Sequence, residues 1–237
     1  MTSQGPELGQ MLSLLSHELR SPLGVVRGYL RLLNQHQGEL SDTHRQAVAA
    51  ALKASDRCVD LLVQASALAQ MWRQEAAIAR QPLTIADLLQ PLAATVRKTD
   101  GQPLPLEVDA AIAVSISGDL ALLQTAISSL ASAVHRAQPD EVTLSIAARL
   151  EPSDEQDGVA IAMVPRGQST DKASETPLDL RRGGLGLDLP MAAAIVAAHG
   201  GTIGERRSHE GRMAVVVWLP LFNEERKTKN EERERRT

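Results

Sequence analysis

The sequence predicts an α+β protein in which a long helical hairpin is followed by an α/β sandwich. Two observations predict this fold class. Through the first third of the 237 residues, apolar side chains recur at steps of 3 and 4, which is typical of helices that pack along a seam. Beyond residue 80, short apolar or alternating runs and turn residues separate helical segments, which is typical of layered strands and helices. We expect a hairpin over 1–79, a sandwich over 80–222 and a charged, disordered tail over 223–237.

The first helix of the hairpin is predicted over residues 7–36. Its apolar seam consists of Leu8, Leu12, Leu15, Leu19, Val26 and Leu33. Pro22 interrupts this pattern, but the periodicity resumes beyond it. We therefore expect Pro22 to bend the helix rather than end it.

The second helix is predicted over 43–78, after a loop that contains Gly38 and a helix cap at Ser41 or Asp42. Its seam consists of Ala51, Ser55, Cys58, Leu62, Ala65, Ala69 and Trp72. Two helices cannot enclose a core by themselves. The two seams therefore predict a homodimer in which two hairpins form a four-helix bundle.

The second region begins at Gln81-Pro82 and mixes strands with helices. The predicted strands are Leu83–Ile85, short runs within Pro103–Ile116, Glu141–Leu150, Gly158–Val164, Thr202–Glu205 and Met213–Leu219. The predicted helices are Asp87–Lys98, Asp119–Ala137 and Leu189–Ala198. Between them, Arg166–Arg182 is polar and irregular, and a loop of this length is usually functional or disordered.

Composition excludes several classes of protein. The chain has 25 Lys and Arg against 29 Asp and Glu, and aromatic residues make up 2%, which argues against nucleic-acid binding. One cysteine excludes an internal disulfide and a multi-cysteine metal site, and no metal site is expected. No apolar run reaches the length of a membrane span, and the first residues lack a signal-peptide pattern. We expect a cytoplasmic protein without a transmembrane segment.

The segment Ser16–Leu23, which reads SHELRSPL, carries the strongest chemical signal. The seam places His17 on the outside of the predicted bundle. A neutral imidazole on a rigid helix is a nucleophile near pH 7. Glu18 can take the ring proton or fix the tautomer, and Ser21 lies one helical turn beyond His17.

This segment closely resembles the H-box of the histidine protein kinases of two-component signalling, whose usual form is Ser-His-Glu-Leu-Arg-Thr-Pro-Leu. The surrounding hairpin resembles the dimerisation and phosphoacceptor domain of that family. The resemblance implies that His17 is the phosphoacceptor and Glu18 the acid/base residue, within a catalytic segment that includes Arg20 and Ser21. Ser21 stands where the family has a Thr or Asn that helps to position water. The implied partner is the receiver domain of a response regulator.

The second region resembles the ATP-binding module of the same family, of the GHKL or HATPase type. The match runs from Gly184-Leu185-Gly186-Leu187-Asp188 to His199-Gly200-Gly201 and resembles the G2 box with its following helix. It implies a site for ATP and Mg²⁺ that includes Gly184, Gly186 and Gly167. Such glycines let backbone amides approach phosphate at a helix N-terminus.

Three departures from the family pattern weaken this implied nucleotide site. Ser128 and Ser132 stand where the family has two Asn, and a hydroxyl is a poorer Mg²⁺ ligand than an amide oxygen. The strand ending at Val164 lacks the Asp that accepts from adenine. Asp188 replaces a glycine and can serve as the N-cap of the following helix. We therefore expect ATP binding to be weak or absent.

Three functions are compatible with these residues. The chain can be a kinase-derived histidine phosphotransferase, which exchanges phosphate between His17 and a receiver aspartate. It can be an active histidine kinase core, or a non-catalytic module that docks a receiver or a partner kinase. The intact His17-Glu18 pair disfavours the third function, and the altered nucleotide pocket disfavours the second. A separate sensor protein is a further expected partner.

Overall fold

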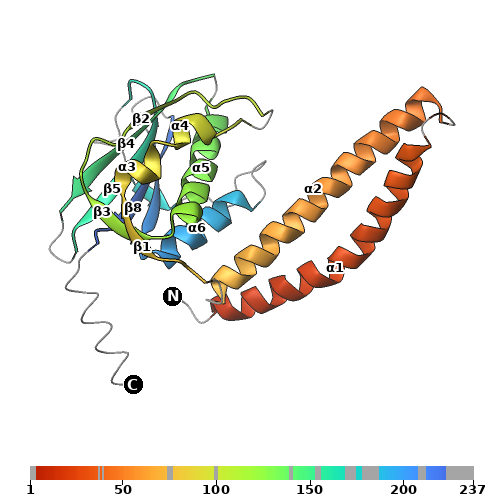
Figure 1. The fold of residues 1–237 in the computed structure, drawn as a ribbon, viewed down its shortest axis with the longest axis horizontal. Helices are drawn as coiled ribbons and strands as arrows, with labels where there is room; N and C mark the ends of the chain where they lie inside the picture. The colour runs from red at the N-terminus through yellow and green to blue at the C-terminus, as the bar shows by residue number, and fades with distance from the viewer. Residues whose placement is uncertain are drawn as a thin grey trace. The chain divides into compact units, whose positions relative to one another are not determined.

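The computed structural model describes residues 4–36, 38, 40–73, 77–98, 101–138, 141–152, 156–168, 175–177, 187–207 and 212–222. The chain divides into two compact units, Met1–Ala77 and Ile78–Thr237. The first is a helical hairpin and the second an α/β unit (Figure 1). This confirms the predicted α+β class. The predicted tail over 223–237 lies outside the described residues.

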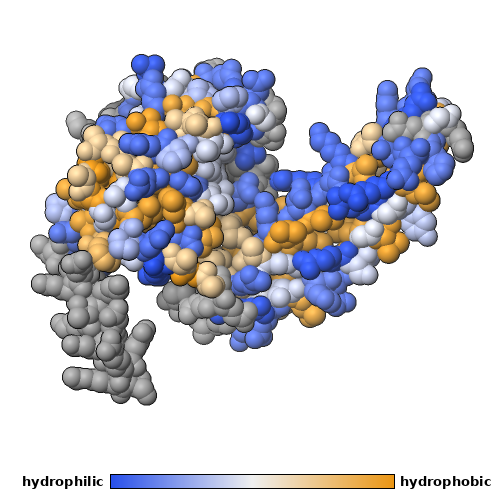
Figure 2. Space-filling view, viewed as in Figure 1, coloured by the Kyte–Doolittle hydropathy of each residue, from blue (hydrophilic) through white to orange (hydrophobic). Residues whose placement is uncertain are grey.

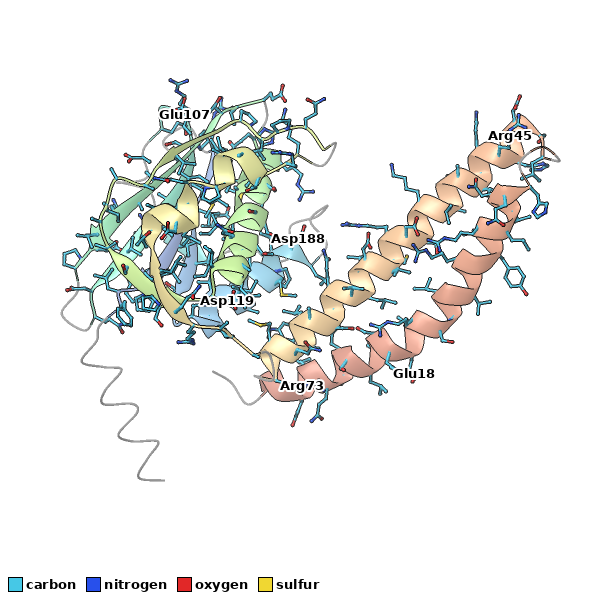
Figure 3. All side chains as sticks on the ribbon, viewed as in Figure 1. Glu18, Arg45, Arg73, Glu107, Asp119 and Asp188 are labelled. Atoms are coloured by element: carbon cyan, nitrogen blue, oxygen red, sulfur yellow. The ribbon has the colours of Figure 1, made fainter. Side chains whose placement is uncertain are left out.

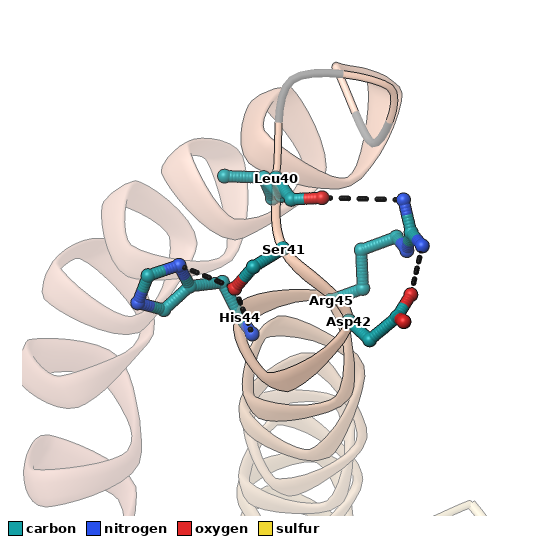
Figure 4. Close-up of polar contacts among 5 residues, drawn as sticks. All are labelled: Leu40, Ser41, Asp42, His44 and Arg45. Atoms are coloured by element: carbon teal, nitrogen blue, oxygen red, sulfur yellow. Dashed lines mark hydrogen bonds and ion pairs between the residues drawn. The ribbon is translucent and has the colours of Figure 1, made fainter.

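The hairpin consists of α1 (Gln4–Gln35) and α2 (Asp42–Trp72). As predicted, α1 continues through Pro22. The N-cap of α2 is Ser41, whose side-chain oxygen accepts the backbone N–H of His44 at 3.4 Å (Figure 4). Helix α2 ends at Trp72 rather than at the predicted residue 78.

The turn of the hairpin is held by polar contacts close to the cap (Figure 4). Arg45 donates to the carbonyl oxygen of Leu40 at 3.2 Å and forms an ion pair with Asp42. Oγ of Ser41 lies 3.0 Å from Nδ1 of His44. These short-range contacts satisfy groups at the helix terminus that have no intrahelical partner.

Helix α1 packs against α2 through a face that begins with small residues and continues with leucines. Gly9 is buried against the last turn of α2, and Ser16 is buried one heptad later. Leu23 and Leu30 continue this face at further heptad steps and are partly buried. The predicted seam residues on the other side of α1 are exposed: Leu8, Leu15, Leu19, Val26 and Leu33. These residues therefore do not form the contact between α1 and α2.

The second unit is a mixed sheet with helices packed on one face (Figure 1). Among the described residues, the order in the six-stranded sheet is β2-β4-β5-β8-β7-β6, with β2 and β4 parallel and the other neighbours antiparallel. Its strands are β2 (Leu106–Asp109), β4 (Leu144–Glu151), β5 (Gly158–Pro165), β6 (Glu175–Pro177), β7 (Thr202–Arg207) and β8 (Met213–Pro220). A separate antiparallel pair joins β1 (Gln81–Thr84) to β3 (Ser115–Gly118).

The helices of this unit are α3 (Ile85–Leu89), α4 (Leu92–Thr95), α5 (Leu120–Arg136) and α6 (Asp188–Ala198). The prediction of one helix over Asp87–Lys98 is wrong, because the segment is divided at Pro91, which is the N-cap of α4. The predicted loop over 166–182 contains β6, and its other residues from 169 to 182 lie outside the described part of the chain.

The core of the second unit lies between the sheet and α5. Some residues of β5 and β8 that face each other across the register are fully buried, as in the pair Ile161 and Val217. The buried residues of α5 follow a helical repeat: Leu123, Ile127, Leu130 and Val134. This spacing of 3 and 4 turns one face of α5 toward the sheet. In the described residues, no helix is long and apolar enough to cross a membrane.

Candidate functional site

His17 lies on the outer surface of α1. Its side chain is 79% exposed and that of Glu18 is 69% exposed. Nδ1 of His17 lies 3.5 Å from Oε1 of Glu18, so a proton on Nδ1 faces the carboxylate. Figure 3 shows Glu18 on the side of α1 that faces away from α2. In this arrangement Nε2 of His17 is the ring nitrogen directed away from Glu18.

The helix geometry separates His17 from the exposed apolar stripe of α1, which comprises Leu8, Leu15, Leu19, Val26 and Leu33. At about 100° per residue, each residue of this stripe lies roughly 160–200° around the helix from His17. The stripe and the histidine therefore occupy opposite sides of α1. Figure 2 shows hydrophobic surface running along the hairpin.

The backbone beneath His17 is fixed by contacts of its neighbours. Ser16 is 1% exposed, and its hydroxyl donates to the carbonyl oxygen of Leu12 at 2.7 Å. Arg20 reaches α2, where its guanidinium lies 3.4 Å from Oγ of Ser66. The hydroxyl of Ser66 donates to the carbonyl oxygen of Leu62 at 2.9 Å, so a lone pair of Ser66 is available to Arg20. Arg20 thus anchors the histidine-bearing turn to the second helix.

Ser21 and Pro22 complete the local arrangement around the histidine. Ser21 is exposed one turn beyond His17. Pro22 has no N–H, so it cannot donate to the carbonyl oxygen of Glu18 as residue i+4 of a helix normally does. The four predicted residues of the H-box segment, His17, Glu18, Arg20 and Ser21, are thus all exposed on two consecutive turns of one helix.

The described residues of the predicted nucleotide site lie on α5, in the turn after β5 and at the start of α6. Ser132 is partly buried on α5. Gly167 follows β5 in a turn with a φ of 79°, a conformation that favours glycine, and no atom lies within 4 Å of the Cβ position. Gly184 and Gly186 lie outside the described residues. Of the predicted pocket, the structure therefore describes Ser132, Gly167 and Asp188.

Asp188 is the first residue of α6 and not its N-cap, which corrects the prediction. The N-cap is Leu187, which makes no side-chain capping hydrogen bond. Asp188 is partly buried in the first turn (Figure 3). A carboxylate at this position is stabilised by the positive end of the helix dipole. Its charge also opposes the binding of a phosphate at the same helix end.

A polar junction that the sequence analysis missed joins α5 to α6. His199 follows the last turn of α6 and is 2% exposed, and its Nε2 lies 3.0 Å from the backbone nitrogen of Asp119. The two partners are 80 residues apart, so the sequence does not indicate their contact. Its one local signal is a histidine before the glycines that end a helix. No group of three or more His, Cys, Asp or Glu suited to a metal ion occurs among the described residues.

Comparisons with known protein families, sequences and solved structures bear on these features. The His Kinase A (phospho-acceptor) domain family matches residues 7–71. The circadian input-output histidine kinase CikA of Synechococcus elongatus is 27% identical over 226 residues, which are 90% of this chain and 30% of CikA. The sensor protein BasS of Salmonella typhimurium is 29% identical over 218 residues, which are 87% of this chain and 57% of BasS.

The fold has a counterpart among solved structures. Full-length ShkA in complex with AMPPNP matches with a TM-score of 0.59 and 20% identity, covering 90% of this chain and 46% of ShkA. This likeness extends over both units and supports the fold described above.

The hairpin that carries the exposed histidine matches the phospho-acceptor domain family, and most of the chain is similar to proteins named as histidine kinases or sensor proteins. These likenesses support a protein of the two-component histidine kinase family. It spans about a third of CikA and somewhat more than half of BasS.

Proposed function

We propose that this chain carries phosphate on His17 and exchanges it with the aspartate of a response-regulator receiver domain. The observation that carries the proposal is the 79% exposure of His17 within the H-box-like segment of a phospho-acceptor match. In-line phosphoryl transfer requires an acceptor that projects into solvent, where a second protein can face it. His17 on the outer side of α1 meets this requirement.

The reaction uses the two ring nitrogens differently. With its proton on Nδ1, His17 offers the lone pair of Nε2 to phosphorus. The N–P bond forms while the P–O bond to the receiver carboxylate breaks, and the carboxylate leaves as an anion. The imidazole gains positive charge, which Glu18 stabilises across the 3.5 Å contact or removes by taking the Nδ1 proton. The reverse transfer returns phosphate to the aspartate.

A second copy of the chain covers the apolar stripe of α1 in this proposal. Five exposed aliphatic residues along one helix face are costly in a monomer, and covering them completes a four-helix bundle. Because His17 lies on the opposite side of α1, dimerisation through this stripe leaves it accessible.

The receiver domain docks on a second set of exposed apolar residues, which we call the flanking set: Leu14, Val25 and Leu32. These residues lie roughly 60–80° around α1 from His17, outside the dimerisation stripe. Gly28 lies between Val25 and Leu32 along the helix and has open space at its Cβ position, so a partner can approach the backbone there. Apolar contacts beside an exposed nucleophile fit a transient protein partner.

ATP is a weak ligand in this proposal, because Ser132 and Asp188 replace the residues that the family resemblance implies. An autophosphorylating kinase core is the second candidate function. Glu18 beside His17 favours it, since attack by a neutral ring on ATP benefits from a base. A non-catalytic docking module is disfavoured by the retention of both residues.

The test measures transfer of labelled phosphate to and from the chain. We expect His17→Gln to abolish exchange with receiver domains that have been phosphorylated with acetyl phosphate, while dimerisation and helicity stay unchanged. His36→Gln is the matched control, because it removes another exposed imidazole from the same helical hairpin. Normal exchange by the His17→Gln protein would refute the proposed site.

Glu18→Gln separates the two candidate functions. An acyl phosphate is a more reactive donor than ATP, so its transfer depends less on a base. We expect a small loss of rate with phosphorylated receivers and a severe loss with Mg-ATP as donor. Rapid labelling of the unsubstituted protein by Mg-ATP alone would favour the kinase core over the phosphotransferase.

A further inference from the structure

The end of α6 meets the start of α5 at a cluster of hydrogen bonds around the buried His199, which we call the helix-end junction: Ala79, Arg80, Asp119 and His199. Asp119 is partly buried, and Ala79 and Arg80 are exposed. All four residues belong to the second unit. Ala79 and Arg80 precede β1, Asp119 is the N-cap of α5, and His199 is the C-cap of α6. The junction therefore joins the segment that enters the unit to the ends of its two longest helices.

Both ring nitrogens of His199 have partners that fix the tautomer. Nδ1 lies 2.7 Å from the carbonyl oxygen of Ile195, which can only accept, so Nδ1 carries the proton. Nε2 lies 3.0 Å from the backbone nitrogen of Asp119, which can only donate, so Nε2 must offer its lone pair. The junction is thus built around a neutral imidazole.

Asp119 links two segments through its two carboxylate oxygens. Oδ1 accepts the N–H of Leu122 at 3.2 Å and caps α5. Oδ2 accepts the N–H of Ala79 at 3.1 Å. A single carboxylate therefore fixes both the first turn of α5 and the segment before β1.

Arg80 adds a contact to the other helix. Its guanidinium donates to the carbonyl oxygen of Ala198, the last residue of α6. Because the C-terminal carbonyls of a helix form the negative end of its dipole, an arginine is favourable there. Ala79 and Arg80 together tie one short segment to α5 and α6.

The surroundings leave little room for rearrangement of His199. A Cβ on Gly118 would lie 2.6 Å from Cδ1 of Leu123 and 3.3 Å from Cδ2 of His199. A proton added to Nε2 would point at the N–H of Asp119 and remove the acceptor on which that N–H depends. The charged side chains that face the ring are Arg80, which opposes protonation, and Asp119, which favours it.

We propose that the helix-end junction is a latch, which holds residues 79–80 on α5 and α6 while His199 is neutral and releases them when His199 gains a proton. This inference goes beyond the proposed phosphotransfer and does not depend on it. Burial is the largest influence on the imidazole and lowers its pKa from 6.5, so the latch stays closed near neutral pH and opens in acid.

Amide exchange measured by NMR on the full-length chain tests the latch. Asp119→Ser keeps a capping oxygen for Leu122 but cannot also reach Ala79, so the protection factor of the Ala79 amide should fall about fivefold. Asp109→Ser is the matched control, because it makes the same change in the same unit at a carboxylate that accepts the local N–H of Ala111. Retained shifts for the amides of β8 verify that each variant is folded.

A second series of measurements follows the same amides from pH 7.5 to pH 5. In the unsubstituted protein, the Asp119 amide shift and the Ala79 protection factor should change together with the ring-carbon shifts of His199. In His199→Gln the two amides should show no such transition. Unchanged Ala79 protection in Asp119→Ser, or an Ala79 protection factor that stays flat while His199 titrates, would overturn the proposal.

Discussion

Gly9 is the residue on which the close approach of the two hairpin helices depends. A Cβ at this position would lie 2.8 Å from Cγ of Arg73 and 3.1 Å from the carbonyl oxygen of Ala69. We expect Gly9→Ala to destabilise the hairpin, because overpacking costs about 1–3 kcal/mol against a gain in helix propensity of about 0.5–1 kcal/mol. Urea unfolding followed by circular dichroism measures the change.

Gly24 supplies the control for this substitution, since no atom lies within 4 Å of its Cβ position. Gly24→Ala should stabilise the same helix by about 0.5–1 kcal/mol through propensity alone. If both variants shifted the unfolding midpoint in the same direction, steric contact at Gly9 would not be the cause.

His199 also gives the folded chain a pH dependence of known sign. Burial, the largest cause, lowers the pKa of His199, so the unfolded chain binds more protons than the folded chain below pH 6.5. Stability should be fully present above pH 6.5 and should fall as the pH drops from 6.5 toward the lowered pKa. Urea midpoints at pH 7.5 and 5.5 measure this loss, which should be smaller in His199→Gln.

The pH comparison between these two proteins isolates His199. His135, whose pKa is lowered first by burial and then by the charge of Lys98, contributes in the same direction but is present in both. An equal loss of stability in the unsubstituted protein and in His199→Gln would assign the pH dependence to His135 or to other groups.

At the scale of helices and strands, hydrophobic spacing predicts which elements form better than it predicts what they contact. The leucine periodicity of α1 identifies the helix correctly, but the face that meets α2 carries Gly9 and Ser16. Small residues let two helix backbones approach closely. Periodicity alone does not show which face of the helix meets the partner helix, so it does not predict this contact. The spacing likewise places Cys58 on the seam of α2, but its side chain is exposed.

The second unit shows the same division between local and tertiary information. Asp119 ahead of a helical repeat is sufficient to predict α5, because the cap and the buried spacing are both local. The break at Pro91 is also a local signal, since proline disfavours helix in the residue before it. The contact of Asp119 with His199 could not be predicted, because it depends on the packing of elements 80 residues apart.

The two apolar sets on α1 should respond differently to the same substitution. Leu15 in the dimerisation stripe is 55% exposed and Val25 in the flanking set is 57% exposed, so the two sites are matched in the single chain. We expect Leu15→Glu to dissociate the proposed dimer, because like charges would be buried at the bundle axis. Val25→Glu should leave the dimer intact and slow phosphate exchange with the receiver.

Sedimentation measures the dimer, and transfer from a phosphorylated receiver measures the exchange. Dissociation by Val25→Glu, with Leu15→Glu still dimeric, would mean that the assignments of the two apolar sets are reversed. If the unsubstituted chain is a dimer and neither variant dissociates, the dimer forms through another surface.

For the whole molecule, the central question is whether the second unit supplies phosphate to the first or only accompanies it. The likeness to ShkA extends over both units, so the fold itself does not distinguish these roles. The answer depends on a few side chains at the nucleotide site that the family resemblance implies. Asp188 lies in the first turn of α6, and a single substitution removes the negative charge that opposes phosphate there.

We expect Mg-ATP to bind weakly, without saturation below roughly millimolar concentration, beyond the usual range of enzyme affinities. A carboxylate about 5 Å from one phosphate charge costs roughly 3 kcal/mol at an effective dielectric constant near 20, which is more than a hundredfold in affinity. Asp188→Gly should therefore tighten binding measurably in titration calorimetry.

Asp87→Gly is the control, because it removes a carboxylate from the first turn of another helix in the same unit, and it should not tighten binding. Micromolar binding by the unsubstituted chain would contradict this account and favour the kinase core, whereas weak binding by both variants would place the main defect at Ser132 or at the turn after β5.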